Sequence, residues 1–249
     1  MFPLGDDNSD RRITPVVNYI LIALNIVVFV LFQGLGSNES FTMAFATVPE
    51  EILTGHDVVT PEESVTDPST GQIVRIPGLE PTPISVYITL LTSMFMHAGF
   101  AHIAGNMLYL WIFGDNIENR IGHGRYLLFY LSCGILASLA QIAVTVFGGG
   151  NTQVPSLGAS GAIAGVLGAY LVLFPGRRVR VFFMYFLQDM PALIVIGFWF
   201  VYQVVLGLGM LGGDGGGVAY GAHVGGFVAG FILIRLFTIG RPAPSVAMR

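Results

Sequence analysis

The chain has 249 residues, of which 53% are hydrophobic and 10% are charged, and its mean hydropathy is +0.72. Because an ordinary soluble domain carries about 25% charged residues, this composition indicates an integral membrane protein. The net charge is −4 and all 11 basic residues are arginines, so there is no strongly basic face to hold nucleic acid. Cys133 is the only cysteine, which excludes a disulfide framework within the chain and a cysteine zinc site.

Six stretches come close to the roughly 20 apolar residues that a helix needs to cross a bilayer. They lie at 15–33, 101–119, 126–147, 157–174, 190–211 and 219–238. Arg11 and Arg12 precede the first stretch, but it lacks a small-residue cleavage site followed by a soluble domain, so we expect a permanent span and not a signal peptide. The sequence thus predicts an all-α polytopic protein with a six-helix membrane domain at 15–238, between tails at 1–14 and 239–249.

The arginines predict how this domain is oriented, because cytoplasmic loops retain Lys and Arg. All of the 11 arginines except Arg75 flank the spans on one side. The opposite side receives the long segment 34–100, which is acidic apart from Arg75, and the short loops 148–156 and 212–218. We therefore expect both termini in the cytoplasm, an external loop at 34–100, and a place in the plasma or cell membrane.

Two loop segments have compositions of their own. Residues 84–96 (ISVYITLLTSMFM) are apolar but too short to span, which predicts a re-entrant or interfacial helix. The segment GGDGGG at 212–217 lacks the lysine of a phosphate-binding loop and follows a span instead of a strand, so we interpret it as a flexible connector.

Four polar side chains lie near the external ends of the three spans that run inward. His102 and Asn106 lie in the first two turns of the second span, Ser160 in the first turn of the fourth, and His223 in the first two turns of the sixth. At about 1.5 Å per residue they fall within about 10 Å of the outer helix ends. His102 and Asn106 are four residues apart and share a helix face, so all four groups can face one water-filled cavity.

Each of these features also has a purely structural interpretation. The small residues of GASGAIAGVLGA (158–169) and GGFVAG (225–230) allow helices to pack closely in lipid without any chemistry. His223, His97 and His102 are each compatible with a core histidine bonded to a carbonyl group. The occurrence of a hydroxyl, two imidazoles and an amide at one depth favours a functional site.

Three motifs in order carry a resemblance to the rhomboid intramembrane serine proteases. They are HAGFAHIAGN (97–106), GASGAIAG (158–165) and AHVGGFVAG (222–230), which match the patterns H-x-x-x-N, G-x-S-G and A-H-x-x-G-x-x-x-G of that family. The resemblance covers about residues 15–238 and implies a six-helix rhomboid core. It implies a protease that needs no cofactor and no metal.

The resemblance also assigns roles to residues. Ser160 is implied as the nucleophile and His223 as its general base, which fits the chemistry because an imidazole can take the hydroxyl proton and later give it to the leaving amine. The implied oxyanion hole consists of His102, the Asn106 side chain and the Ser160 backbone N–H, helped by the N-terminal end of the helix dipole. The implied structural neighbours are His97, Gly158, Gly161, Gly226 and Gly230.

Glycines around Ser160 and along its helix have a physical explanation within this resemblance. Gly158 and Gly161 leave the backbone uncrowded for a substrate strand. Gly165 and Gly168, opposite Gly226 and Gly230, let the fourth and sixth spans approach and bring His223 to Ser160. The pair Glu118-x-Arg120 resembles the E-x-R motif of the family, a polar clamp at the inner end of the second span.

The sequence departs from the family in two places. Ala164 stands where some members have a tyrosine stacked on the catalytic base, so a different ring must orient His223, or none does. The segment 34–100 has no tryptophan, whereas some members carry a Trp-Arg pair there. Asp214 precedes His223 by nine residues in a glycine-rich loop, and we do not expect it to complete a triad.

The resemblance implies single-span membrane proteins as substrates, cut near the external end of the span after a small residue. Because a helix buries its peptide bonds in its own hydrogen bonds, the substrate must unwind locally, and helix-weakening Gly or Pro should help. Movement of the fifth span and of 212–217 would admit it from the lipid. Two alternatives are a catalytically silent rhomboid-like binder of membrane proteins and a metal transporter that uses His97, His102 and His223.

Overall fold

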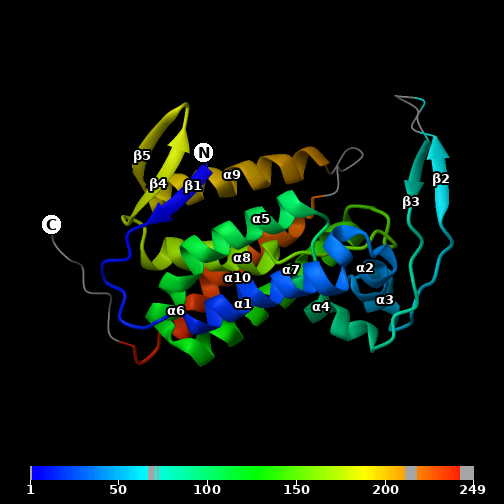
Figure 1. Cartoon of the computed structure of the whole chain (residues 1–249), viewed down its shortest axis with the longest axis horizontal. Helices are drawn as coiled ribbons and strands as arrows, with labels where there is room; N and C mark the ends of the chain where they lie inside the picture. The colour runs from blue at the N-terminus through cyan, green and yellow to red at the C-terminus, as the bar shows by residue number, and fades with distance from the viewer. Residues whose placement is uncertain (1, 67–70, 72, 211–217, 242–249) are drawn as a thin grey trace.

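The computed structural model describes residues 2–66, 71, 73–210 and 218–241, and its helices lie side by side in one bundle (Figure 1). Helices occupy the positions of all six predicted spans, and within these helices the sequence contains no proline. They are α1 (Val16–Val27) with its π-helical end η1 (Val28–Phe32), α5 (Phe100–Tyr109) with η5 (Leu110–Gly114) and α6 (Asp115–Ile121), α7 (His123–Phe147), α8 (Ser160–Leu173), α9 (Ala192–Met210) and α10 (Tyr220–Phe237). The prediction of a mainly helical protein is confirmed.

Length and hydropathy distinguish these helices. Within the described residues, α7 and α10 are each long and apolar enough to cross a membrane. A bent pair, Val86–Phe95 followed by Phe100–Ile121 at 81°, meets the same criteria together. The remaining apolar helices, Val16–Phe32, Ser160–Leu173 and Ala192–Leu208, are shorter.

The all-α prediction misses five strands. An antiparallel sheet of order β1-β4-β5 joins β1 (Phe2–Asp6) to the hairpin of β4 (Arg178–Phe183) and β5 (Phe186–Pro191), and a second hairpin pairs β2 (Glu63–Thr66) with β3 (Ile73–Ile76). In β4 the sequence RVRVFF alternates, and Val179 and Val181 are fully buried while Arg178 and Arg180 face outward. This period of two is the strand pattern, and it lies between two predicted spans.

The segment 34–100 folds into short elements at one end of the bundle, away from the N-terminal strand and the α6–α7 turn (Figure 1). They are η2 (Gly34–Gly36), α2 (Glu39–Phe45), α3 (Pro49–Thr54) and the β2–β3 hairpin, followed by one helical run of η3 (Val86–Ile88), α4 (Thr89–Thr92) and η4 (Ser93–Phe95). Asn38 caps α2 by accepting a hydrogen bond from the Phe41 backbone N–H at 3.1 Å. The run from η3 to η4, over Val86–Phe95, forms a short helix where the sequence predicts one, at 84–96.

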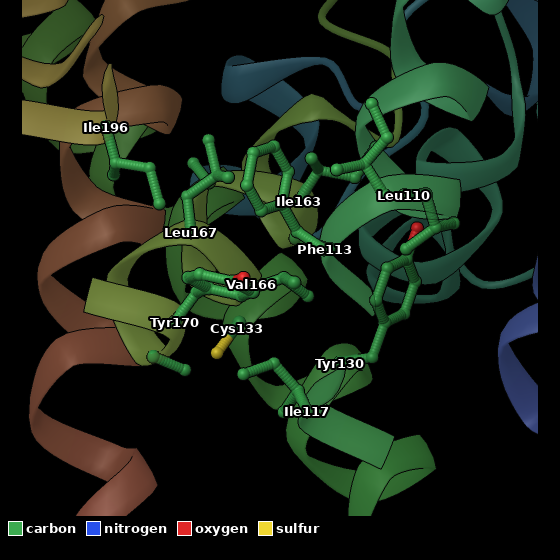
Figure 2. Packing of buried hydrophobic residues seen from close by; sticks show 14 of the residues in the cluster. Leu110, Phe113, Ile117, Tyr130, Cys133, Ile163, Val166, Leu167, Tyr170 and Ile196 are labelled. Carbon is green, nitrogen blue, oxygen red and sulfur yellow. The ribbon is translucent and has the colours of Figure 1, made fainter. Parts of the chain in front are cut away.

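The hydrophobic core lies where η5, α7 and α8 meet (Figure 2). Phe113 packs edge-on against Tyr170 with ring centroids 5.0 Å apart, and both side chains are fully buried. Cys133, Val166 and Leu167 fill the space around them and are also buried. Because lipid is as apolar as these side chains, the close van der Waals packing of the core, and not the removal of apolar surface from water, stabilises the bundle.

Helices α8 and α10 cross at backbone contact. A side-chain carbon on Gly226 would overlap the carbonyl oxygen of Gly161, and one on Gly230 would overlap that of Gly165. One on Gly168 would overlap the carbonyl oxygen of Phe227. The expected packing of small residues between these two helices is therefore present.

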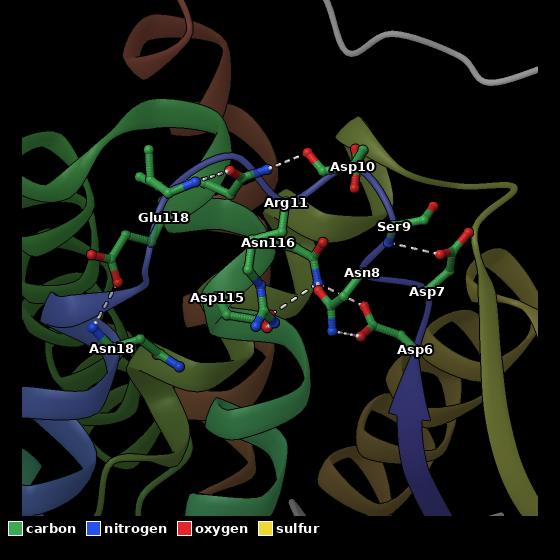
Figure 3. A network of polar contacts seen from close by, with 12 residues as sticks. Asp6, Asp7, Asn8, Ser9, Asp10, Arg11, Asn18, Asp115, Asn116 and Glu118 are labelled. Carbon is green, nitrogen blue, oxygen red and sulfur yellow. Dashed lines mark hydrogen bonds and ion pairs between the residues drawn. The ribbon is translucent and has the colours of Figure 1, made fainter.

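A polar network ties the N-terminal tail to the ends of three helices (Figure 3). Arg177 reaches Asp10 at 2.6 Å and also contacts Asn116, while Arg11 pairs with Asp115. Nearby, Glu118 accepts the backbone N–H groups of Val17 at 2.9 Å and Asn18 at 2.7 Å. Glu118 thus holds the first turn of α1, while the Nε of Arg120, the other residue of the predicted pair, is buried without a hydrogen-bond partner among the described residues.

Asp6 makes this network sensitive to pH. Its carboxylate accepts from the Asn116 amide at 2.8 Å and from the Tyr170 hydroxyl. Burial raises the pKa of Asp6 from 3.8 to about 7, and Asp115 adds to this while Tyr170, Arg177 and Arg11 oppose it. The folded protein therefore holds the Asp6 proton more tightly than the unfolded chain does.

We expect stability to fall as the pH rises from about 4 to about 7 and to level off above that, because the raised pKa of Asp6 favours the protonated folded state. In Asp6→Asn this part of the pH dependence should be lost. Thermal unfolding in detergent micelles between pH 4.5 and 8.5 measures it. Equal slopes in the two proteins would show that Asp6 does not couple to folding.

Candidate active site

Ser160 is the first residue of α8, and its hydroxyl lies against the imidazole of His223 on α10. The distance from Ser160 Oγ to His223 Nε2 is 2.8 Å, which is a hydrogen bond. Ser160 and His223 are both partly buried. The structure thus brings together the two side chains to which the family resemblance assigns the roles of nucleophile and base, although α8 begins three residues later than the predicted span at 157–174.

The close crossing of α8 and α10 fixes this pair in place. Gly161 follows Ser160 directly and faces Ala137 of α7 and Ala222 of α10, the residue before His223. Gly226 is one turn beyond His223 and touches the backbone of Gly161, and Gly230 lies one turn deeper. The four glycines of the predicted site therefore lie at or beside the dyad, three of them at the helix crossing and Gly158 in the loop before Ser160.

The loop before Ser160 is held by the segment 34–100. Gly158 donates its backbone N–H to the Ser93 carbonyl at 2.8 Å. Thr47 and Ser156 exchange backbone hydrogen bonds of 3.0 and 2.8 Å. The Thr47 hydroxyl also meets the Ser93 hydroxyl at 2.8 Å. The segment 34–100 thereby sets the position of the loop that leads into Ser160.

Gly158 has a φ of +128°, a conformation that side chains rarely adopt, and it packs against His102. A side-chain carbon at Gly158 would lie 2.9 Å from His102 Cε1 and 3.0 Å from its Nε2. His102 Nδ1 accepts the backbone N–H of Ala98 at 3.3 Å, so Nε2 carries the proton of the neutral ring. A donor from α5 therefore points toward the backbone that precedes Ser160.

Asn106 lies one turn further along the same face of α5. Its side chain is 8% exposed, and its amide Nδ2 is buried without a hydrogen-bond partner among the described residues. Buried donors are normally paired, so this unpaired amide is free to donate a hydrogen bond to an oxygen of a bound molecule. The Ser160 backbone N–H, as the first in its helix, has no acceptor within α8.

His97 has a structural place behind His102. Its ring is fully buried and meets the His102 ring edge-on, with centroids 5.1 Å apart. Gln33 holds its backbone, accepting the His97 N–H at 2.8 Å and donating to its carbonyl at 3.0 Å. Among the residues that the structure describes, no three His, Cys, Asp or Glu side chains are grouped as ligands of a metal.

Helix α9 contributes neighbours of His223 that sequence reasoning missed. His223 Nδ1 bonds the Gln203 side-chain oxygen at 2.8 Å, and the Trp199 ring lies 6.0 Å from the imidazole. Gln203 is the only amide in the apolar stretch ALIVIGFWFVYQVVLGLGM, and a polar side chain within a span was the signal that could have found it. Ala164 is fully buried in the core.

Two cavities adjoin the site. One of about 20 Å³ lies beside Ser160 and is lined mainly by small residues, among them Gly158, Ala162 and Ser138. The other, of about 370 Å³, lies between η5, α8 and α9 and is lined by Tyr109, Phe113, Leu167, Trp199 and Gln203 among others. Asp214 and the loop 212–217 lie outside the described residues.

Comparisons with known proteins identify the family of the chain. The family model described as the Rhomboid domain matches residues 85–239, which include all of the site residues named above except those of the segment before 85. The chain is 31% identical over 219 residues to "Rhomboid protease GluP" of Bacillus subtilis, covering 87% of this chain and 34% of that protein. It is 31% identical over 147 residues to "Rhomboid protein 1, mitochondrial" of Saccharomyces cerevisiae, covering 58% of this chain and 40% of the relative.

A third relative is "Presenilin-associated rhomboid-like protein, mitochondrial" of Homo sapiens, 33% identical over 120 residues, which are 44% of this chain and 31% of the human protein. The chain therefore spans about a third of the length of the curated relatives it matches. The match to the domain model covers more than half of the chain and contains all three motifs from His97 to Gly230. The chain belongs to the rhomboid family.

Proposed function

We propose that this protein is an intramembrane serine endopeptidase in which Ser160 is the nucleophile and His223 the general base. The observation that carries the proposal is the 2.8 Å hydrogen bond between Ser160 Oγ and His223 Nε2. The unpaired Asn106 amide supports it, because it is a buried donor on the same side of the site as His102. A relative named a rhomboid protease adds support from outside the chain.

The reaction divides into acylation and deacylation. The Ser160 hydroxyl gives its proton to His223 Nε2 while Oγ bonds to the carbonyl carbon of the substrate, and the carbonyl oxygen becomes an oxyanion. His102 Nε2–H, Asn106 Nδ2–H and the Ser160 backbone N–H are the donors for that oxyanion. His223 then protonates the leaving amine, and in the second half it activates the water that hydrolyses the acyl-enzyme.

We propose single-span membrane proteins as substrates, cut after a small residue near the external end of the span. The cavity of about 20 Å³ beside Ser160 supports the size preference, because it has room for about one water-sized group. The larger cavity of about 370 Å³ faces α9 and supports entry of the unwound segment from the lipid at that helix. In this proposal the helix that moves to admit the substrate is α9, the fifth predicted span.

The proposed topology has six spans, with both termini in the cytoplasm of a cell membrane. The arginine distribution supports this orientation, since β1, the C-terminal end of α10 and the α6–α7 turn lie at one end of the bundle while the acidic segment 34–100 lies at the other (Figure 1). Ser160 then opens toward the external side. The membrane lipid is the medium from which substrates arrive, and we propose no cofactor, metal or nucleic-acid partner.

Covalent labelling of the nucleophile tests the proposal. The wild type in liposomes, treated with a fluorophosphonate, should carry one modification on Ser160 by peptide mass spectrometry and should lose its cleavage of a reporter span in proportion. Ser138, which lines the same small cavity, is an internal control and should stay unlabelled. Cleavage that persists after full labelling would refute the serine mechanism, and absence of both labelling and cleavage would favour a catalytically silent binder.

A further inference from the structure

Helix α9 presents a glutamine to the side of His223 that faces away from Ser160. Gln203 Oε1 lies 2.8 Å from His223 Nδ1, while His223 Nε2 lies 2.8 Å from Ser160 Oγ. The three side chains form a chain of two hydrogen bonds from α9 through α10 to α8. Gln203 is 8% exposed, although its neighbours Tyr202 and Val205 on α9 are more than half exposed.

The position of the proton on the imidazole determines which atom donates in each of these two hydrogen bonds. To accept the Ser160 hydroxyl proton, Nε2 must be unprotonated, so a neutral ring carries its proton on Nδ1. A proton on Nδ1 needs an acceptor, and the acceptor that faces it is the amide oxygen of Gln203. If this oxygen is removed, the ring loses its preference for the tautomer that can act as a base, and it can rotate.

We propose, on the basis of the serine protease function above, that Gln203 is the positioning residue that holds His223 in its base-competent tautomer and orientation. Gln203 occupies the place that an acid has in a Ser-His-Asp triad, but it is neutral. Its hydrogen bond goes to His223 Nδ1, on the side of the ring away from the Ser160 hydroxyl.

The surroundings on α9 agree with a dedicated contact. Trp199, one turn before Gln203, lies with its ring 6.0 Å from that of His223 at 38°, so α9 provides both an aromatic wall and a hydrogen-bond acceptor. An amide buried in an apolar helix is unfavourable unless it is hydrogen-bonded, and the His223 bond satisfies the Gln203 oxygen. Ala164, which is fully buried on α8, provides no ring against the imidazole.

Kinetics of three variants in liposomes test the proposal. Gln203→Leu keeps the size and removes the acceptor, and we expect kcat to fall about 10- to 100-fold with KM within about twofold. Gln203→Glu restores an acceptor and places a carboxylate beside Nδ1. Because a carboxylate favours the protonated imidazole, the acidic limb of the kcat/KM profile should move to higher pH, an effect that a packing role would not produce.

Gln141→Leu is the matched control. Gln141 on α7 accepts the Ala222 backbone N–H at 3.1 Å, so it contacts α10 beside His223 without touching the ring. Its pH profile should equal that of the wild type. If Gln203→Leu keeps kcat within twofold, or if Gln203→Glu leaves the acidic limb unmoved, the proposal is overturned.

A spectroscopic measurement separates this proposal from the protease function itself. In protein labelled with ¹⁵N-histidine, the His223 signal, assigned by its loss in His223→Ala, should show a protonated Nδ1 and an unprotonated Nε2. In Gln203→Leu it should shift toward the average of two tautomers. A wild-type ring protonated on Nε2, or an unchanged signal in the variant, would overturn the positioning role whether or not any reporter is cleaved.

Discussion

Ser160→Ala and His223→Ala are each expected to lower kcat for cleavage of a reporter span by about 10⁴-fold or more. Without Oγ no acyl-enzyme can form, and without the imidazole nothing takes the hydroxyl proton at neutral pH. The 2.8 Å bond between these atoms makes them one unit, so the double variant should be no slower than the slower single variant.

Reconstituted protein and a fluorescent reporter span in liposomes give the rates, and thermal unfolding in detergent confirms that each variant is folded. Ser138→Ala is the matched control, because it removes a hydroxyl from the small cavity beside Ser160 without touching His223. It should cleave at a rate near that of the wild type. Persistent cleavage by folded Ser160→Ala would reject the mechanism, and additive losses in the double variant would argue against a coupled pair.

Asn106→Ala is expected to lower kcat about 10²- to 10³-fold and to change KM little, because the amide would bind the oxygen more strongly once it bears charge. The physical basis is the buried Nδ2, which has no partner within the described part of the chain. Removing an unpaired donor should not destabilise the fold, so the melting temperature should stay within a few degrees of the wild type. The same liposome assay, run over a range of reporter densities, separates kcat from KM.

Asn106→Asp gives a sharper form of this test. Its carboxylate is similar in shape but repels a developing oxyanion, so its kcat should be below that of Asn106→Ala. A rate for Asn106→Ala within threefold of the wild type would remove Asn106 from the oxyanion hole. If the fall in kcat is accompanied by a large fall in melting temperature, Asn106 has a structural role instead.

The sequence predicts the helices well because each lies in an apolar run without proline and is bounded by arginines, loops or turn formers. It also locates the four polar groups, since their depth follows from counting residues from the helix ends. The start of α8 at Ser160 depends on the backbone of Gly158 and is three residues later than predicted. The sheet was missed because β1 and β4 are separated by most of the chain.

The contacts around the site show where sequence reasoning ends. Gln203 stands out as a polar residue in an apolar helix, but its bond to His223 depends on how α9 rotates against α10, which one sequence does not encode in a readable pattern. The backbone hydrogen bonds of Thr47 and Ser93 to the loop before Ser160 connect segments more than 60 residues apart in the sequence. Such pairings follow from the tertiary fold and not from any local period.

The bonds between Thr47 and Ser156, and between Ser93 and Gly158, also constrain how the protein is made. Both partners in each bond must reach the same side of the membrane before the loop can take its shape, and they emerge from synthesis far apart in time. Thr47 and Ser93 are made first, and the loop before Ser160 must then reach them to form these bonds. The position of Ser160 at the start of α8 therefore depends on a segment of the chain that is made well before α8 itself.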